Sequence, residues 1–107
     1  MSPDAFAAST VRIAPDPQWS RPLAALLWLK KGGLVVGPEY ETGHGLCQMD
    51  EGERDHDRVH ALSHWIEGDM PNAAYWYRQT GETRAETIEA EWRRLVTDLA
   101  ASAPSGD

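Results

Sequence analysis

The signals that end one helix and begin the next are unusually close together in the second half of the chain. Gly68 is followed at once by Asp69, with Pro71 two residues further on. Glycine commonly ends a helix in the left-handed conformation, aspartate caps the following helix, and proline suits its first turn. This order predicts two helices joined by a very short link, over about residues 53–67 and 70–80.

A further helix is expected near the C-terminus. Gly81 can end the preceding helix, and Thr83 with Glu86 has the spacing of a capping box. The apolar residues that follow recur at helical intervals and would form one buried face: Ile88, Trp92, Leu95, Val96 and Leu99. Residues 102–107 are expected to fray.

An apolar segment predicts another helix earlier in the chain. Residues 22–31 begin with Pro22, follow the potential cap Ser20, and end in two lysines before Gly32. Their leucines, alanines and tryptophan leave no polar side, so we expect this helix to be buried all round.

The rest of the chain gives weaker signals. Residues 32–52 contain six glycines and predict a long glycine-rich loop, with at most a very short strand over 34–36. Residues 1–19 contain three prolines and predict a loose arm, with a short extended piece over 10–13. The fold class is therefore all-α: one domain over residues 1–107, with about four helices in a small orthogonal or bundle-like array.

Composition restricts the classes of partner. The 107 residues carry a formal charge of −7, which argues against binding to nucleic acid or to an anionic membrane surface. No apolar run is long enough to span a bilayer. A single cysteine and the absence of a signal peptide favour the cytoplasm. Five tryptophans are expected to supply much of the core.

Histidines and acids recur along the helix predicted over residues 53–67. His56, Asp57, His60, His64 and Glu67 fall within one sector of about 100° on a helical projection, opposite the apolar side. Imidazoles and carboxylates on a common face can bind a metal, move protons, or form only a hydrogen-bonded polar surface.

In the first interpretation, the i, i+4 pair His60 and His64 ligates a divalent metal. His44 and Cys47 could add ligands from the predicted loop, and Glu67 or Asp69 could contribute from the end of the helix. Zinc suits histidine with Asp or Cys, whereas iron or manganese suits a set richer in carboxylates. The zinc-protease spacing H-E-x-x-H is absent.

Two other interpretations need no metal. In one, a carboxylate such as Asp57 orients His60 as a general base, which would place Asp57 and Glu67 in catalytic roles. In the other, the polar stripe is a solvated face with ion pairs, or His64 bonds a neighbouring helix.

The helix predicted over residues 70–80 carries possible ligand-positioning groups. Asn72 and Tyr75 share one face and can line a pocket, while Arg78 can bind an anion or pair with a nearby acid. The structural alternative is a half-buried tyrosine and a surface arginine.

This region resembles an uncharacterised family of small bacterial and fungal proteins. The resemblance rests on the pattern H-x3-H-x2-EGD-x2-NA-x-YWYR, from His60 to Arg78, about a fifth of the chain. It implies a site around His60, His64, Glu67 and Asn72 without naming its chemistry.

The sequence therefore predicts a small helical protein with a divalent-metal or small-molecule site between these two helices, acting in hydrolysis or proton transfer. The competing hypothesis is a non-catalytic helical interaction module or homodimer. An exposed apolar patch beside Trp76 would favour it.

Overall fold

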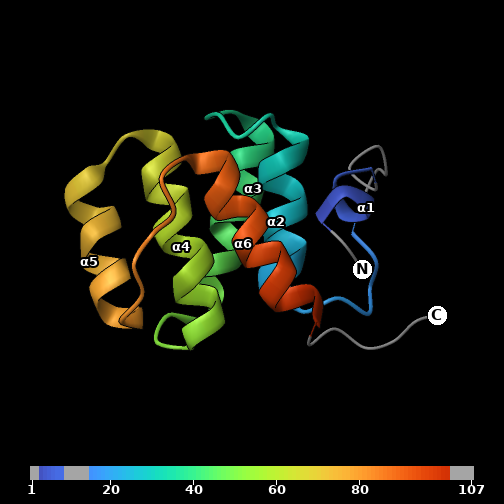
Figure 1. The fold of residues 1–107 in the computed structure, drawn as a ribbon. Helices are drawn as coiled ribbons and strands as arrows, with labels where there is room; N and C mark the ends of the chain where they lie inside the picture. The colour runs from blue at the N-terminus through green and yellow to red at the C-terminus, as the bar shows by residue number, and fades with distance from the viewer. Residues whose placement is uncertain (1–2, 9–14, 102–107) are drawn as a thin grey trace.

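The computed structural model describes residues 3–8 and 15–101 (Figure 1). In these ranges the chain forms six α-helices and one short 3-10 helix, and no strand. The all-α prediction is confirmed there, although the expected number of helices was four. The helices are α1 (Pro3–Ala8), α2 (Arg21–Lys31), α3 (Pro38–Cys47), α4 (Arg54–Glu67), α5 (Met70–Thr80) and α6 (Ile88–Ala101), with the 3-10 helix at Gln48–Asp50.

Helix α4 lies in the middle of the fold and contacts α2, α3, α5 and α6 (Figure 1). Helix α5 lies at one end of the molecule, where it packs against α4 and reaches α6 through the hydrogen bond from Tyr77 Oη to Glu91 Oε2. Helix α1 lies at the opposite end, against α2 and α6. None of the helices in the described part of the chain combines the length and apolar character needed to cross a bilayer.

The local signals that predicted α2, α4 and α5 are present as expected. The Ser20 side chain accepts a hydrogen bond from Leu23 N and caps α2. Helix α4 ends at Gly68, whose φ of 83° lies in the left-handed region. The Asp69 side chain accepts from Asn72 N and caps α5. These caps join residues three or four positions apart, so sequence spacing alone reveals them.

The predicted start of the last helix was wrong. Helix α6 begins at Ile88, and the cap is Thr87, whose Oγ1 accepts from Ala90 N at 3.0 Å. The expected capping residue, Thr83, lies in an irregular link. The buried Glu91 carboxylate binds both this link and α5, because it accepts from Ala85 N at 2.9 Å and from Tyr77 Oη at 2.9 Å.

The predicted loop over residues 32–52 was also wrong in its centre, where α3 and the 3-10 helix form. Glycines disfavour a helix locally, but packing on α2 compensates here. A Cβ placed on Gly43 would lie 3.0 Å from Ala25 O and 3.1 Å from Leu29 Cδ2. Gly43 therefore allows the two helices to approach closely.

The described part of the predicted loose arm, residues 3–8 and 15–19, packs against the core. Helix α1 lies within them, and Phe6 is fully buried, with its ring 5.0 Å from Trp19 and 5.7 Å from Trp92 between centroids. The extended piece predicted over 10–13 and the frayed end predicted over 102–107 lie outside the described residues.

The main core forms where α2, α4 and α6 meet. Trp92 is fully buried and its Nε1–H donates to Leu26 O at 2.9 Å, which ties α6 to α2. Trp19 and Trp65 pack at the edge of this core, so the tryptophans contribute unequally to it. A smaller cluster lies between α4 and α5, around Ala61 and Tyr77.

Substitution of Gly43 by valine tests the α2–α3 contact. We expect the free energy of unfolding to fall by about 1–3 kcal/mol, because the added methyl groups would push α3 away from α2. Gly45 in the same helix has no atom within 4 Å of its would-be Cβ, so Gly45→Ala should stabilise the protein by up to about 1 kcal/mol. Urea denaturation followed by circular dichroism measures both. Equal effects of the two changes would contradict the close approach at Gly43.

Candidate functional site

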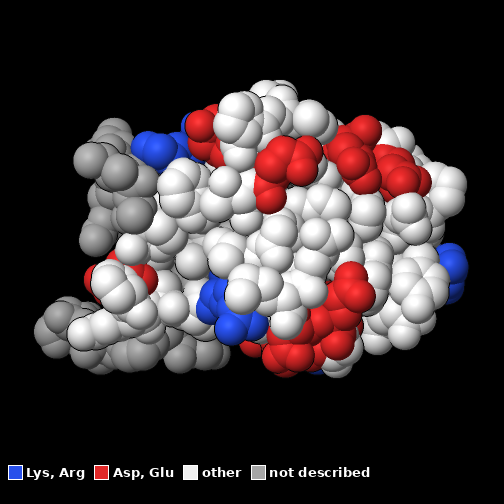
Figure 2. All heavy atoms as spheres, turned by 180° about the vertical axis from the view of Figure 1, so that it is seen from behind, with Lys and Arg blue, Asp and Glu red and all other residues white. Residues whose placement is uncertain are grey.

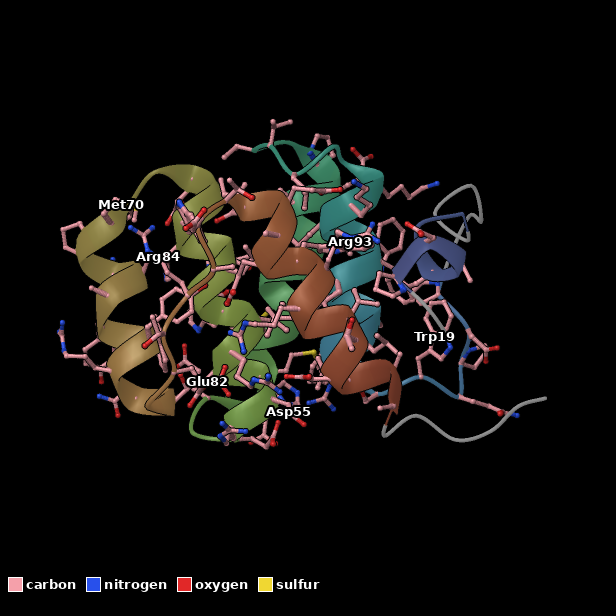
Figure 3. All side chains as sticks on the ribbon, in the orientation of Figure 1. Trp19, Asp55, Met70, Glu82, Arg84 and Arg93 are labelled. Atoms are coloured by element: carbon pink, nitrogen blue, oxygen red, sulfur yellow. The ribbon has the colours of Figure 1, made fainter. Side chains whose placement is uncertain are left out.

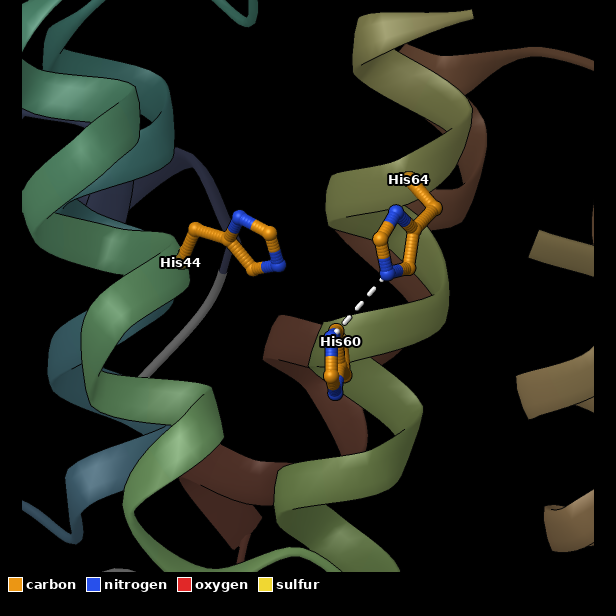
Figure 4. Close-up of side chains that lie close together, drawn as sticks. All are labelled: His44, His60 and His64. Atoms are coloured by element: carbon orange, nitrogen blue, oxygen red, sulfur yellow. Dashed lines mark hydrogen bonds between the residues drawn. The ribbon is translucent and has the colours of Figure 1, made fainter. Parts of the chain in front are cut away.

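Three imidazole rings converge between α3 and α4 (Figure 4). His44 comes from α3, and His60 and His64 lie one turn apart on α4. The ring centroids are 4.7–5.0 Å apart. Each ring offers one nitrogen, and these three nitrogens lie within 4.8 Å of one another. The described residues thus contain a cluster of three histidines, His44, His60 and His64, that can hold a metal ion; we call this cluster the imidazole group.

Glu67 orients the His64 ring. The His64 Nδ1–H donates to Glu67 Oε1 at 2.5 Å across one helical turn. A neutral imidazole that donates through Nδ1 carries its lone pair on Nε2. His64 Nε2 lies 3.1 Å from His60 Nε2. The carboxylate therefore directs a ligand-competent nitrogen toward the centre of the group.

Tyr40 orients His44 in a comparable way. The Tyr40 hydroxyl donates to Ser63 O at 3.1 Å, and its oxygen lies 3.3 Å from His44 Nδ1. Because the single hydroxyl proton is directed to the carbonyl, His44 Nδ1–H is the donor in the second contact. His44 Nε2 then carries the lone pair, and this buried atom has no hydrogen-bond partner among the described residues. Figure 4 shows a nitrogen of His44 pointing toward His64.

His60 is the most enclosed ring of the three. It is 2% exposed and stacks on Trp76 of α5, with centroids 4.3 Å apart and ring planes 24° from parallel. Its Nδ1 is buried without a hydrogen-bond partner, and Glu51 Oε2 lies 3.8 Å away. A small movement of the exposed Glu51 side chain would complete a carboxylate–imidazole pair like that of His64 and Glu67.

The site favours the neutral form of His44 and His60. Burial, with a smaller contribution from the neighbouring His44 and His64, lowers the pKa of His60 from 6.5 to about 4. Burial and His64 also lower the pKa of His44, which Glu67, Glu41 and Glu51 partly oppose. Neutral imidazoles retain the lone pairs that ligate metals, so the site is poised to bind a cation at neutral pH.

The lowered His60 pKa predicts acid destabilisation of the metal-free protein. Between pH 6.5 and about 4, the unfolded chain binds a proton at this residue and the folded chain does not. The free energy of unfolding must therefore fall as pH falls through this window, by up to about 3 kcal/mol. As pH falls from 6.5 to about 4, the urea concentration at the midpoint of unfolding should decrease more steeply with pH in the wild type than in His60→Gln. Equal slopes would contradict the lowered pKa.

Acidic side chains surround this region. The carboxylates of Glu41, Glu51 and Glu67 all act on His44. Figure 2 shows several patches of Asp and Glu, and few Lys or Arg, on the face turned away in Figure 1. Negative potential raises the local concentration of cations. A second group that can hold a cation, formed by His64, Glu67 and Asp69, adjoins the first, and both share His64.

The other predicted site residues lie outside the imidazole group. Asp57 Oδ1 accepts from Gly52 N at 3.0 Å and fixes the turn before α4. Asn72 Nδ2 donates to Asp69 Oδ2 at 2.7 Å, beside the α5 cap. Tyr75 is 44% exposed and contacts Trp76 edge-on. Arg78 has no ion pair among the described residues and lines a cavity between α5 and the link to α6.

His56 and Cys47 are also held apart from the group. His56 Nδ1 lies 2.5 Å from Glu53 Oε1, and His56 Nε2 lies 3.3 Å from Arg21 Nη1. The buried Cys47 thiol donates to Gly43 O at 3.3 Å, and burial raises its pKa to about 12. Cys47 is therefore a thiol within the core, and it is absent from the ligating groups of the described residues.

The sequence suggested His44 only as an added ligand from a loop, and it did not indicate the roles of Tyr40, Glu51 and Trp76. One local signal was available: Pro38 follows Gly37, and acidic residues occupy the first turn of α3. A helix there places Tyr40 and His44 one turn apart. Stacking of Trp76 on His60 has no such signal, because it depends on how α5 packs against α4.

Comparisons with models of known protein families, with curated proteins and with solved structures gave no match for this chain.

Proposed function

We propose that this protein binds one divalent transition-metal ion, of the class that includes zinc, through the Nε2 atoms of His44, His60 and His64. The observation that carries this proposal is the buried His44 Nε2, which has no partner and belongs to a group of three converging imidazole nitrogens. A buried acceptor without a partner costs free energy, and a metal ion would satisfy it.

The spacing of the nitrogens fits a tetrahedral ion after a small adjustment. With Zn–N bonds of about 2.0–2.1 Å, tetrahedral ligand nitrogens are roughly 3.3 Å apart. The Nε2 atoms of His60 and His64 are 3.1 Å apart, and all three ligand atoms lie within 4.8 Å of one another. Rotation of the partly exposed His44 ring can shorten the wider separations.

The surrounding hydrogen bonds have the arrangement expected around metal-bound histidines. Such histidines usually donate their other ring N–H to a carboxylate or another oxygen. Glu67 already accepts from His64, Tyr40 accepts from His44, and Glu51 stands near His60. Each of the three imidazoles thus has an oxygen on the side away from the proposed ion.

Three protein ligands leave a fourth position open, as in catalytic zinc sites. An ion held there would lower the pKa of a bound water and supply a hydroxide for hydrolysis at neutral pH. Glu67 and Glu51 lie at the Nδ1 atoms of His64 and His60, where they would orient these imidazoles as ligands. We therefore propose hydrolysis or water-assisted proton transfer as the reaction class.

Calorimetric titration of the metal-free, untagged protein with zinc tests the proposal. We expect saturable binding of one ion per chain and a higher melting temperature with zinc. His56→Gln is the matched control, because it removes an imidazole of the same helix that lies outside the group. Absence of saturable binding, or equal loss of binding in His56→Gln and His44→Gln, would contradict the proposal.

A further inference from the structure

A cavity beside α5, at the end of the molecule opposite α1, is separate from the imidazole group. It has a volume of about 440 Å³ and lies between α5 and the link that leads to α6. This volume is within the range of small-molecule sites, roughly 300–1,000 Å³. Helix α5 packs against α4, and the cavity lies where the link to α6 faces α5.

The cavity has an apolar floor and rim. Ala73 and Tyr77 of α5 are buried, and Ala74 and Met70 lie at the exposed edge. Trp76, which stacks on His60, projects from a different side of α5, about 130° from the centre of the cavity-lining residues on a helical projection. A ligand in the cavity would therefore not need to contact the imidazole group.

Two arginines give this cavity a positive charge. Among the described residues, the Arg78 side chain has no ion pair or hydrogen bond, and Arg84 has no ion pair but lies over the Trp65 ring, 4.3 Å from its centroid. Other described arginines pair with carboxylates: Arg54, Arg58, Arg93 and Arg94. In a chain of net charge −7, two guanidinium groups without acidic partners on one cavity need an explanation.

The acidic residue of the cavity does not cancel this charge. Glu82 forms ion pairs with Arg54, Arg58 and Arg94, so its carboxylate is already neutralised by three guanidinium groups. Figure 3 shows Met70 and Arg84 near one end of α5, while Glu82 lies toward the other end of the link. The arginines and the apolar surface are therefore free to act on a bound molecule.

We propose that this cavity binds a small carboxylic acid with an apolar body. Arg78 would hold the carboxylate, for which the planar guanidinium offers two parallel N–H donors. Arg84 would add positive charge, and Ala73, Ala74 and Met70 would contact the hydrocarbon. The site is independent of metal binding at the imidazole group.

Titration of the isotope-labelled, metal-free protein with octanoate, followed by amide NMR shifts, tests this site. We expect saturable shifts of residues 70–84, weaker binding of acetate, which lacks the apolar body, and weaker binding of octan-1-ol, which lacks the charge. Arg78→Gln should weaken octanoate binding about 10-fold and leave octan-1-ol unchanged, because it removes a charge-assisted hydrogen bond. Ala74→Trp should fill the cavity and prevent binding of both.

The matched control is Arg93→Gln. Arg93 pairs with Asp4, and Figure 3 shows it at the opposite end of the molecule from α5. This change should leave octanoate affinity unchanged. The proposal is overturned if octanoate gives no saturable shifts, if octan-1-ol binds as tightly as octanoate, or if the Arg78 and Arg93 variants lose affinity equally.

Discussion

Replacement of Glu91 by alanine is expected to lower the free energy of unfolding by about 3–5 kcal/mol. Glu91 is fully buried, and its carboxylate accepts hydrogen bonds from Tyr77 Oη at 2.9 Å and from Ala85 N at 2.9 Å. Arg94 donates to both of its oxygens. Burial acts to raise the Glu91 pKa, but these donors lower it below its ordinary value. Removal of the carboxylate leaves Tyr77 Oη and Ala85 N without an acceptor, and Arg94 keeps only its bond to Glu82 among the hydrogen bonds of the described residues.

Urea denaturation followed by circular dichroism measures the loss. Glu89→Ala is the control, because Glu89 lies on the same helix and forms only an exposed ion pair with Lys30. Such pairs contribute about 0–1 kcal/mol. Similar effects of the two substitutions would show that the buried Glu91 network does not hold the α5–α6 link in place.

Replacement of His60 by alanine is expected to weaken zinc binding roughly 1,000-fold, equivalent to about 4 kcal/mol. His60 is the central imidazole, because it contacts His44, His64 and Trp76. The loss of a direct ligand should exceed the 10–100-fold effect typical of a residue that orients one. Glu67→Gln, which changes only the acceptor of the His64 N–H, should fall in this smaller range.

Competition with a chromophoric zinc chelator would measure both affinities. Melting in the absence of zinc should be recorded for each variant, so that a folding defect is distinguished from loss of a ligand. The ligand assignment fails if His60→Ala retains wild-type zinc affinity, or if Glu67→Gln loses as much affinity as His60→Ala does.

Local sequence signals revealed the helices that carry most of the site. The caps at Ser20, Gly68 and Asp69 each act within four residues, so their spacing in the chain specifies where α2, α4 and α5 begin or end. The regular geometry of a single helix likewise places His60 and His64 one turn apart on α4. For these residues, prediction needed only the geometry of a single helix.

Local signals failed where packing opposed them. Residues 38–47 contain Gly43 and Gly45, which disfavour a helix, yet α3 forms because Gly43 lets it pack tightly against α2. Thr83 and Glu86 have the spacing of a capping box, yet α6 begins only at Ile88 because the Glu91 network holds the preceding link. In both places a tertiary contact outweighed a local preference.

By itself, the sequence determined the all-helical character of the described chain, the ends of three helices and the His60–His64 spacing, because each depends on hydrogen bonds within a few residues. Only the tertiary structure decided that His44 joins this pair, that Trp76 covers it, and that Arg78 faces a separate cavity. Those arrangements join residues far apart in the chain, and they depend on the burial of whole helix faces rather than on any local pattern.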